Sequence, residues 1–113
     1  MAFSDALKDK IIKLGNKQKL SAIVKYSAHS DPEIRATVAM TLAMISTYDA
    51  GTALIPLLRD SDPMVRATAA TSAADMHAKH CEEYVKKLAF SDSDPTVRAA
   101  AKEAYDRLKD RVV

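Results

Sequence analysis

Residues 30–35 read SDPEIR, and the same pattern returns as SDPMVR at residues 61–66 and as SDPTVR at residues 93–98. The three copies begin 31 and 32 residues apart. Self-similarity at a nearly constant period of this length is typical of repeat architectures, in which each repeat is one supersecondary unit. Three similar units stacked along one axis are therefore predicted.

Each copy of the pattern predicts the start of a helix. Asp is a strong N-cap, because its carboxylate accepts hydrogen bonds from backbone N–H groups of the first turn. The Pro that follows loses no hydrogen bond, since that N–H would be unpaired in any case. Apolar and small residues then recur at the spacing of one helical face. These predicted core positions are Ile34, Val38, Ala39, Thr41, Leu42, Ile45, Val65, Ala69, Ala70, Ser72, Ala73, Met76, Val97, Ala101, Ala104, Tyr105 and Leu108.

A second helical stretch precedes each Asp-Pro, at residues 20–28, 52–58 and 82–90. Each repeat is therefore predicted to be a helix, a short turn and a second helix. Pro56 is expected in the first turn of its helix. Gly51 is expected to mark the break between the first two repeats.

The N-terminal residues lie outside the repeated pattern. An apolar stripe predicts one further helix, which covers the end of the stack, through Phe3, Leu7, Ile11 and Leu14. Gly15 is expected to end this helix in a left-handed conformation. The predicted organisation is a single domain at residues 1–113, with a capping helix at 1–15 and repeats at 16–48, 49–79 and 80–113. Lys102 interrupts the apolar pattern of the last repeat, as expected of a terminal repeat with a polar outer face.

Composition restricts the class of protein. The 113 residues suit one domain, and 48% apolar with 28% charged residues is ordinary for a globular chain. The single cysteine, Cys81, excludes an internal disulfide and favours a reducing compartment, so a cytoplasmic location is predicted. The N-terminal region has no long apolar run, and neither a signal peptide nor a membrane span is expected. A net charge of +2 is too small to indicate nucleic-acid binding by itself.

The Asp-Pro-x-[Ile/Val]-Arg start, the Ala-rich second helix and the period of about 31 residues resemble HEAT repeats. They are most similar to the short bacterial and archaeal subtype first noted in phycobilin lyases. The resemblance implies an all-α, right-handed solenoid of about three helix pairs, with first helices on the convex face and second helices on the concave face. It also implies a structural ladder between neighbouring repeats, made by Asp31, Asp62 and Asp94 with Arg35, Arg66 and Arg98.

HEAT-like proteins act mostly as scaffolds, so the resemblance implies a non-enzymatic protein-binding function on the concave face. A groove of three helices is small, which favours a peptide, a single helix, a transient partner or self-association. The residues expected to line it are Glu33, Thr37, Met40, Met44, Met64, Thr68, Thr71, Asp75, Thr96, Ala100, Glu103 and Arg107. Methionine suits adaptable contact surfaces but also fills gaps between helices, and both interpretations of the three methionines stay open.

Other candidate chemistry is weaker. His77, His80 and Cys81 are the one cluster of metal-ligating residue types, but zinc sites need three or four ligands and His29 is the only other histidine. Cys81 as a nucleophile would need His77, His80 or Lys79 to lower its pKa, and nothing supplies an oxyanion site. A polar turn with a half-buried cysteine is therefore predicted, with no metal, cofactor or catalytic residue. An anion site at the repeated arginines is also disfavoured, because each Arg recurs in register with a capping Asp.

Charge is uneven along the chain. Residues 1–30 carry six lysines against two aspartates, whereas residues 31–62 carry two arginines against five acidic residues. A solvated cap face is favoured for the basic end, although it could also contact an acidic partner, nucleic acid or an anionic surface. Two alternatives to the scaffold therefore remain open. One is an accessory subunit of a bilin-lyase-like or other enzyme complex, and the other is weak nucleic-acid binding through the lysine-rich end.

Overall fold

The computed structural model describes residues 3–110, and for Phe3 the backbone alone. Within this range the chain forms seven α-helices and no strand, which confirms the predicted all-α class. Residues 1–2 and 111–113 of the predicted ranges, and the Phe3 side chain of the predicted stripe, lie outside this description. The elements are α1 (Phe3–Asn16), α2 (Leu20–Val24) with the 3-10 turn η1 (Lys25–Ala28), α3 (Pro32–Ile45), α4 (Tyr48–Leu58), α5 (Pro63–Asp75), the 3-10 turn η2 (Lys79–Cys81), α6 (Glu82–Ser91) and α7 (Pro95–Lys109).

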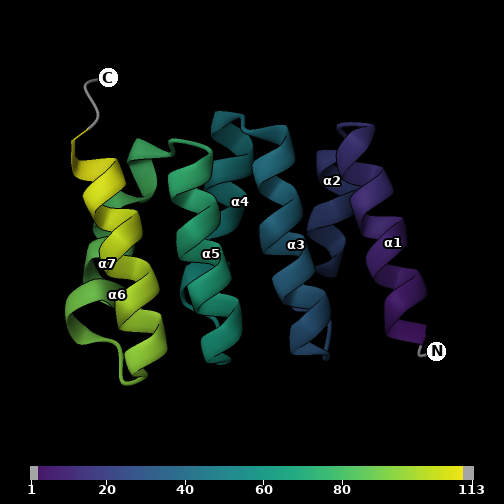
Figure 1. Cartoon of the computed structure of the whole chain (residues 1–113). Helices are drawn as coiled ribbons and strands as arrows, with labels where there is room; N and C mark the ends of the chain where they lie inside the picture. The colour runs from purple at the N-terminus through teal and green to yellow at the C-terminus, as the bar shows by residue number, and fades with distance from the viewer. Residues whose placement is uncertain (1–2, 111–113) are drawn as a thin grey trace.

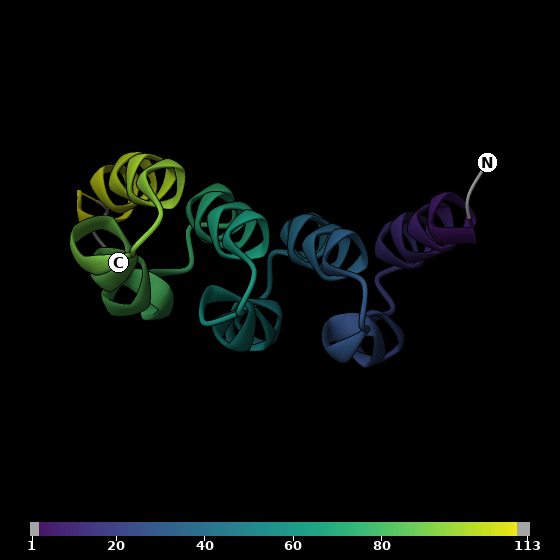
Figure 2. The same ribbon diagram turned by 90° about the horizontal axis from the view of Figure 1, so that it is seen from below.

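The helices form a two-layered solenoid (Figure 1). Seen along the helices, α1, α3, α5 and α7 make one layer and α2, α4 and α6 make the other (Figure 2). Neighbouring helices pack together in the layer made by α1, α3, α5 and α7. In addition, α3, α5 and α7 each pack against the helix that precedes them in the chain, which belongs to the other layer. The N-terminal helix α1 lies beside α3 and therefore occupies the place of a second helix.

Side-chain caps explain where four of the helices begin. Asp31, Asp62 and Asp94 have extended backbones, and each carboxylate accepts a hydrogen bond from a backbone N–H of the helix that follows, at 2.8–2.9 Å. The predicted capping role of these aspartates is therefore observed. Thr47 caps α4 in the same way, because its Oγ1 accepts from the N–H of Ala50 at 3.1 Å.

The core is made by the inward faces of both layers. All predicted core positions are buried except Tyr105, which is half-buried. Alanines on the second helices, such as Ala39, Ala69 and Ala70, are fully buried and let neighbouring helices approach closely. Larger side chains such as Leu42 and Leu54 fill the space between the layers. Each fully buried Leu contributes about 1.5–3 kcal/mol relative to an exposed one. Lys102 is exposed, as predicted.

Gly15 has a different role from the one predicted. It lies within α1, and Gln18 adopts the left-handed conformation instead, with φ of 59°. A Cβ on Gly15 would lie 2.5 Å from Cγ2 of Thr41 and 3.1 Å from Sδ of Met44. The missing side chain therefore allows the close approach of α1 to α3.

Two further predictions about α4 are wrong, because the helix begins earlier than the sequence pattern indicated. Gly51 lies in its first turn rather than at a break between repeats. A Cβ there would lie 2.5 Å from Cε1 of His80, so this glycine makes room for a side chain of the next repeat. Pro56 lies in the last turn, two residues before the helix ends at Leu58.

Candidate partner-binding surface

The solvent-facing side of α1, α3, α5 and α7, called here the second-helix face, carries most of the predicted contact residues. Met40, Met44 and Met64 are 47%, 40% and 45% exposed, so they do not fill gaps in the core. Thr37 is only 8% exposed and its hydroxyl donates to the carbonyl oxygen of Glu33 at 2.9 Å, although it still lines a groove on this face. The second-helix face is therefore neutral and partly apolar near its centre.

Two shallow grooves adjoin on this face and share Met40 and Thr68. The first has a volume of about 240 Å³ and is lined by Lys8, Glu33, Ala36, Thr37, Met40, Met64 and Thr68. The second has a volume of about 280 Å³ and is lined by Met40, Ala67, Thr68, Thr71, Ser72, Asp75 and Ala100. The lining residues of the two grooves come from α1, α3, α5 and α7.

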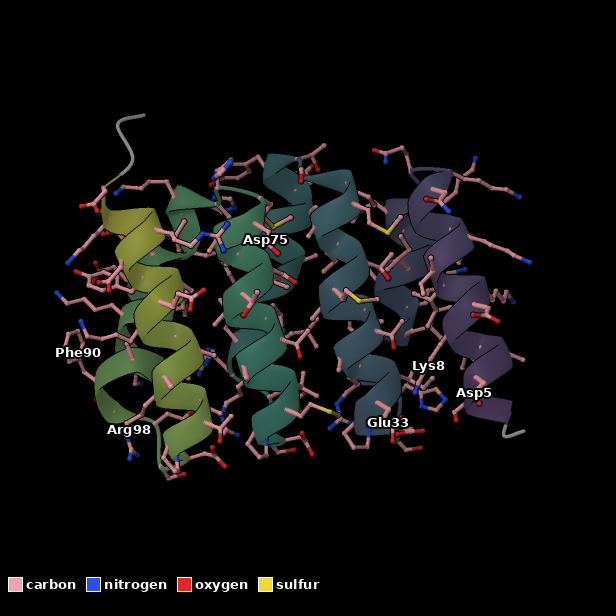
Figure 3. All side chains as sticks on the ribbon, viewed as in Figure 1. Asp5, Lys8, Glu33, Asp75, Phe90 and Arg98 are labelled. Atoms are coloured by element: carbon pink, nitrogen blue, oxygen red, sulfur yellow. The ribbon has the colours of Figure 1, made fainter. Side chains whose placement is uncertain are left out.

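Charged side chains at the margins of this face are tied by ion pairs. Lys8 pairs with Glu33 between α1 and α3 (Figure 3). Nη1 of Arg107 lies 3.0 Å from Oδ1 of Asp75, which joins α7 to α5. The other predicted residues of the third repeat, Thr96 and Glu103, are exposed on α7, and Met44 lies outside both grooves.

The repeated arginines pair with other aspartates than the predicted ones. Nε and Nη2 of Arg35 donate to the two carboxylate oxygens of Asp60 at 2.8 and 3.0 Å. Arg66 pairs with Asp92 in the same bidentate geometry, at 2.7 and 3.0 Å. The capping aspartates cannot take this place, because their carboxylates point at the amides of their own helices. The Asp two residues before each cap, in the next repeat, is the partner instead.

These pairs link successive repeats and are largely withdrawn from water. Burial acts to raise the pKa of Asp60, but hydrogen bonds from Arg35 and from its own turn outweigh burial and lower it. The hydrogen bond from Arg66 is the main cause of the lowered pKa of Asp92. The Arg–Asp ladder thus joins the repeats and leaves Arg35 and Arg66 no free edge for an anion. Arg98 forms no ion pair within residues 3–110, although its Nη1 donates to the carbonyl oxygen of Asp92 at 2.6 Å.

The histidine and cysteine cluster is not arranged for metal binding. His77 is an exposed residue with φ of 55° beyond the end of α5, so it does not share a helical face with His80. The His80 ring stacks on Tyr48 with centroids 4.0 Å apart, and its Nε2 lies 3.1 Å from the carbonyl oxygen of Tyr48. No group of three metal-ligating residues exists among residues 3–110. The cluster instead joins the second and third repeats.

Cys81 is fully buried rather than half-buried as predicted. Its Sγ lies 3.3 Å from the carbonyl oxygen of Gly51, and burial raises the pKa of the thiol to about 11. The neighbouring His and Lys side chains therefore do not activate it. A neutral, enclosed thiol is a poor nucleophile, since the thiolate is the reactive form.

Cys81 should react with Ellman's reagent at pH 8 at least about a thousandfold more slowly in the native protein than in guanidinium, because access requires unfolding. Absorbance at 412 nm measures the reaction. A Thr52→Cys variant supplies the control, since position 52 is exposed on α4 and a thiol there should react at the rate of a free peptide. Rapid modification of native Cys81 with the helices intact would show that the burial is wrong.

The lysine-rich end and one further groove complete the surface. Lys10, Lys13, Lys17, Lys19 and Lys25 are exposed around α1 and α2. No described helix combines the length and the apolarity needed to cross a membrane. A groove of about 640 Å³ lies between α4 and α6. No sequence pattern predicts it, because it depends on how closely these two helices pack.

Comparison with protein families finds a match to HEAT repeats over residues 51–113. The matched region runs from the first turn of α4 through α7 and covers more than half of the chain. It does not distinguish the phycobilin-lyase subtype. No curated protein matches the chain significantly.

Proposed function

This chain belongs to the HEAT-repeat family, and on that premise we propose that it is a non-enzymatic scaffold that binds a peptide or a single helix of a protein partner on its second-helix face. HEAT repeats commonly act as protein-interaction scaffolds. The observation that carries the proposal is the exposure of Met40, Met44 and Met64 on that face, with Met40 and Met64 beside the two adjoining grooves.

The chemistry of this surface suits an apolar and adaptable contact. Methionine side chains are flexible and polarizable, so they adjust to the shape of a ligand at low cost. The threonines between them provide hydroxyl groups without charge, and exposed large apolar residues grouped on one face are typical of interaction sites. An amphipathic helix laid across α3 and α5 would bury the methionines while its polar side met the ion pairs at the margins.

The test is a double substitution at the shared centre of the two grooves, Met40→Lys with Thr68→Glu, which leaves the net charge unchanged. A tagged wild-type chain is used to recover partners from its native cells, and the affinity of each purified partner is then measured. Binding should weaken at least about tenfold, because the partner would have to remove water from the introduced Lys and Glu even if these two side chains pair with each other. Circular dichroism should show intact helices.

Two controls separate this surface from the rest of the molecule. Thr52→Glu adds a charge to an exposed position of α4 and should leave the affinity unchanged. Reversing Lys10, Lys13 and Lys17 to Glu tests the basic end. The second-helix face is not the binding site if the partner still binds the Met40→Lys, Thr68→Glu protein and is lost on lysine reversal.

A further inference from the structure

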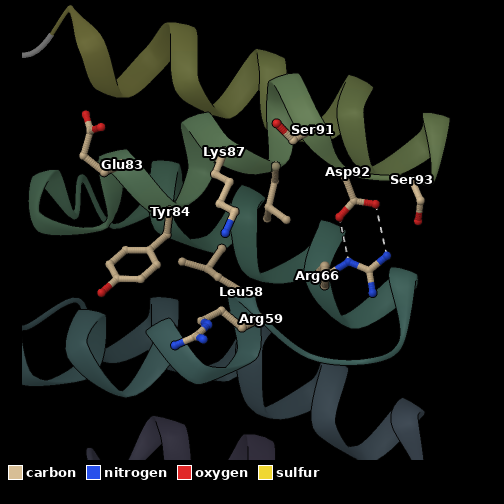
Figure 4. Close-up of a pocket in the computed structure, with 10 residues that line it drawn as sticks. Leu58, Arg59, Arg66, Glu83, Tyr84, Lys87, Ser91, Asp92 and Ser93 are labelled. Carbon is tan, nitrogen blue, oxygen red and sulfur yellow. Dashed lines mark hydrogen bonds and ion pairs between the residues drawn. The ribbon is translucent and has the colours of Figure 1, made fainter.

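The groove between α4 and α6 is lined mainly by residues of these two helices and of the turns that follow them (Figure 4). Figure 2 shows that α4 and α6 belong to the layer opposite the second-helix face. The groove arises because α5 and α7 pack closely through buried alanines, whereas α4 and α6 meet more loosely. Its volume of about 640 Å³ falls within the range of ligand-binding pockets, about 300–1,000 Å³.

The floor of the groove is apolar and one wall is aromatic. Leu58, at the end of α4, and Leu88, on α6, reach the groove although they are only 1% and 9% exposed. Tyr84 stands beside them with 38% of its surface exposed. A side chain of moderate size could therefore be enclosed between the leucines and the tyrosine ring.

Two cations border this apolar floor without a partner. Arg59 and Lys87 are exposed, line the groove, and form neither an ion pair nor a side-chain hydrogen bond with any residue of the described range 3–110. Arg66 also lines the groove, but Asp92 neutralises it in the Arg–Asp ladder (Figure 4). Glu83 is the remaining carboxylate of the lining. The groove therefore offers two free positive charges against one free negative charge.

We propose that this groove binds an acidic peptide segment of a protein partner, at a site separate from the second-helix face. A carboxylate of the peptide lies between Arg59 and Lys87, and an adjacent apolar side chain packs on Leu58 and Leu88 against Tyr84. Charge complementarity favours a short acidic segment over nucleic acid, because Glu83 would repel a continuous polyanion.

The probe is the fluorescein-labelled peptide Ser-Leu-Asp-Glu-Leu-Phe-Ser, compared with a counterpart in which Asn and Gln replace the two acidic residues. Fluorescence anisotropy measures binding to the full chain in 150 mM salt, where unspecific attraction is screened. The acidic peptide should bind at least about tenfold more tightly than the amide peptide, since charged hydrogen bonds are stronger than neutral ones.

Substitutions locate the site. Arg59→Gln with Lys87→Gln should weaken the acidic peptide about tenfold and bring it close to the amide peptide. Lys10→Gln with Lys13→Gln is the matched control, because it removes the same charge from exposed positions on α1, away from this groove, and should change the affinity less than about twofold. Met40→Lys with Thr68→Glu should also leave this affinity unchanged. The proposed function of the second-helix face and the proposed peptide site in this groove can therefore be refuted independently.

Four results would overturn the proposal. Equal binding of the acidic and amide peptides would show that the two cations do not recognise a carboxylate. Equal losses of affinity in the Arg59/Lys87 and Lys10/Lys13 proteins would show that the peptide is attracted by net charge alone. Tighter binding of an oligothymidylate, or light scattering that shows a dimer lost on Arg59→Gln with Lys87→Gln, would assign the groove to nucleic acid or to a second copy of the chain.

Discussion

Replacing Arg66 by Ala should lower the free energy of unfolding by about 3 kcal/mol. The side chains of Arg66 and Asp92 are 14% and 5% exposed, so removal of the guanidinium leaves a nearly buried carboxylate without its partner. The carbonyl oxygens of Asp60 and Ser61, which accept from Nη1 at 2.9 and 3.0 Å, lose their donor as well. Urea unfolding followed by circular dichroism measures the loss.

The third copy of the motif supplies the control for this prediction. Arg98 keeps the hydrogen bond to a carbonyl oxygen of its own turn but forms no ion pair within residues 3–110, so Arg98→Ala should cost about 1 kcal/mol. The difference between wild type and Arg66→Ala should shrink below about pH 4, because the stability from an Asp of lowered pKa is lost as the pH falls through that pKa. Similar losses at Arg66 and Arg98 would mean that the carboxylate contributes little.

Gly15→Ala should destabilise the protein by about 1–3 kcal/mol, although alanine favours a helix by about 1 kcal/mol over glycine. The new Cβ would lie 2.5 Å from Cγ2 of Thr41, a short branched side chain on a buried part of α3. The two helices must then separate. Thermal unfolding followed by circular dichroism measures the effect.

In a Thr41→Ala background, Gly15→Ala should no longer lower the free energy of unfolding. The obstructing Cγ2 is then absent, and the flexible Met44 can move aside, so helix propensity decides the result. Gly15→Ala in the Thr41→Ala background should be neutral or stabilising by up to about 1 kcal/mol. A loss of equal size in both backgrounds would show that Gly15 is needed for a reason other than contact with Thr41.

The parts of the fold that sequence predicted best are those that depend on local chemistry. The Asp-Pro starts of α3, α5 and α7 and the buried faces behind them need no knowledge of the neighbouring repeat. Gly15 and Gly51 were misinterpreted because a glycine that frees the backbone for a turn looks the same in sequence as one that admits a neighbouring side chain. Which case applies depends on how two helices cross, and only the packed structure contains that information.

The ladder was predicted with the wrong aspartates, yet a signal for the right ones was present. Asp60 and Asp92 stand two residues before their caps, whereas the first copy has His29 in that place. This departure fits the structure. The position of α1 that corresponds to Arg35, 31 residues earlier, is Ser4, so there is no arginine for a carboxylate at position 29 to pair with. The groove between α4 and α6 had no such signal, since it depends on the loose packing of two helices.

The positions of the ladder pairs influence which part of the molecule unfolds first. Each ladder pair couples one repeat only to the next, so stability is a sum over nearest-neighbour joints and the weakest joint opens first. Arg35–Asp60 and Arg66–Asp92 hold the two inner joints, whereas the joint between α1 and α3 has no ladder pair. It is held by the Lys8–Glu33 pair, by the hydrogen bond from Nε2 of Gln18 to the carbonyl oxygen of Met44 at 3.2 Å, and by the apolar packing of Ile11. We therefore expect α1 to separate before the ladder-linked repeats do, which would uncover Ile11 while the remaining repeats stay folded.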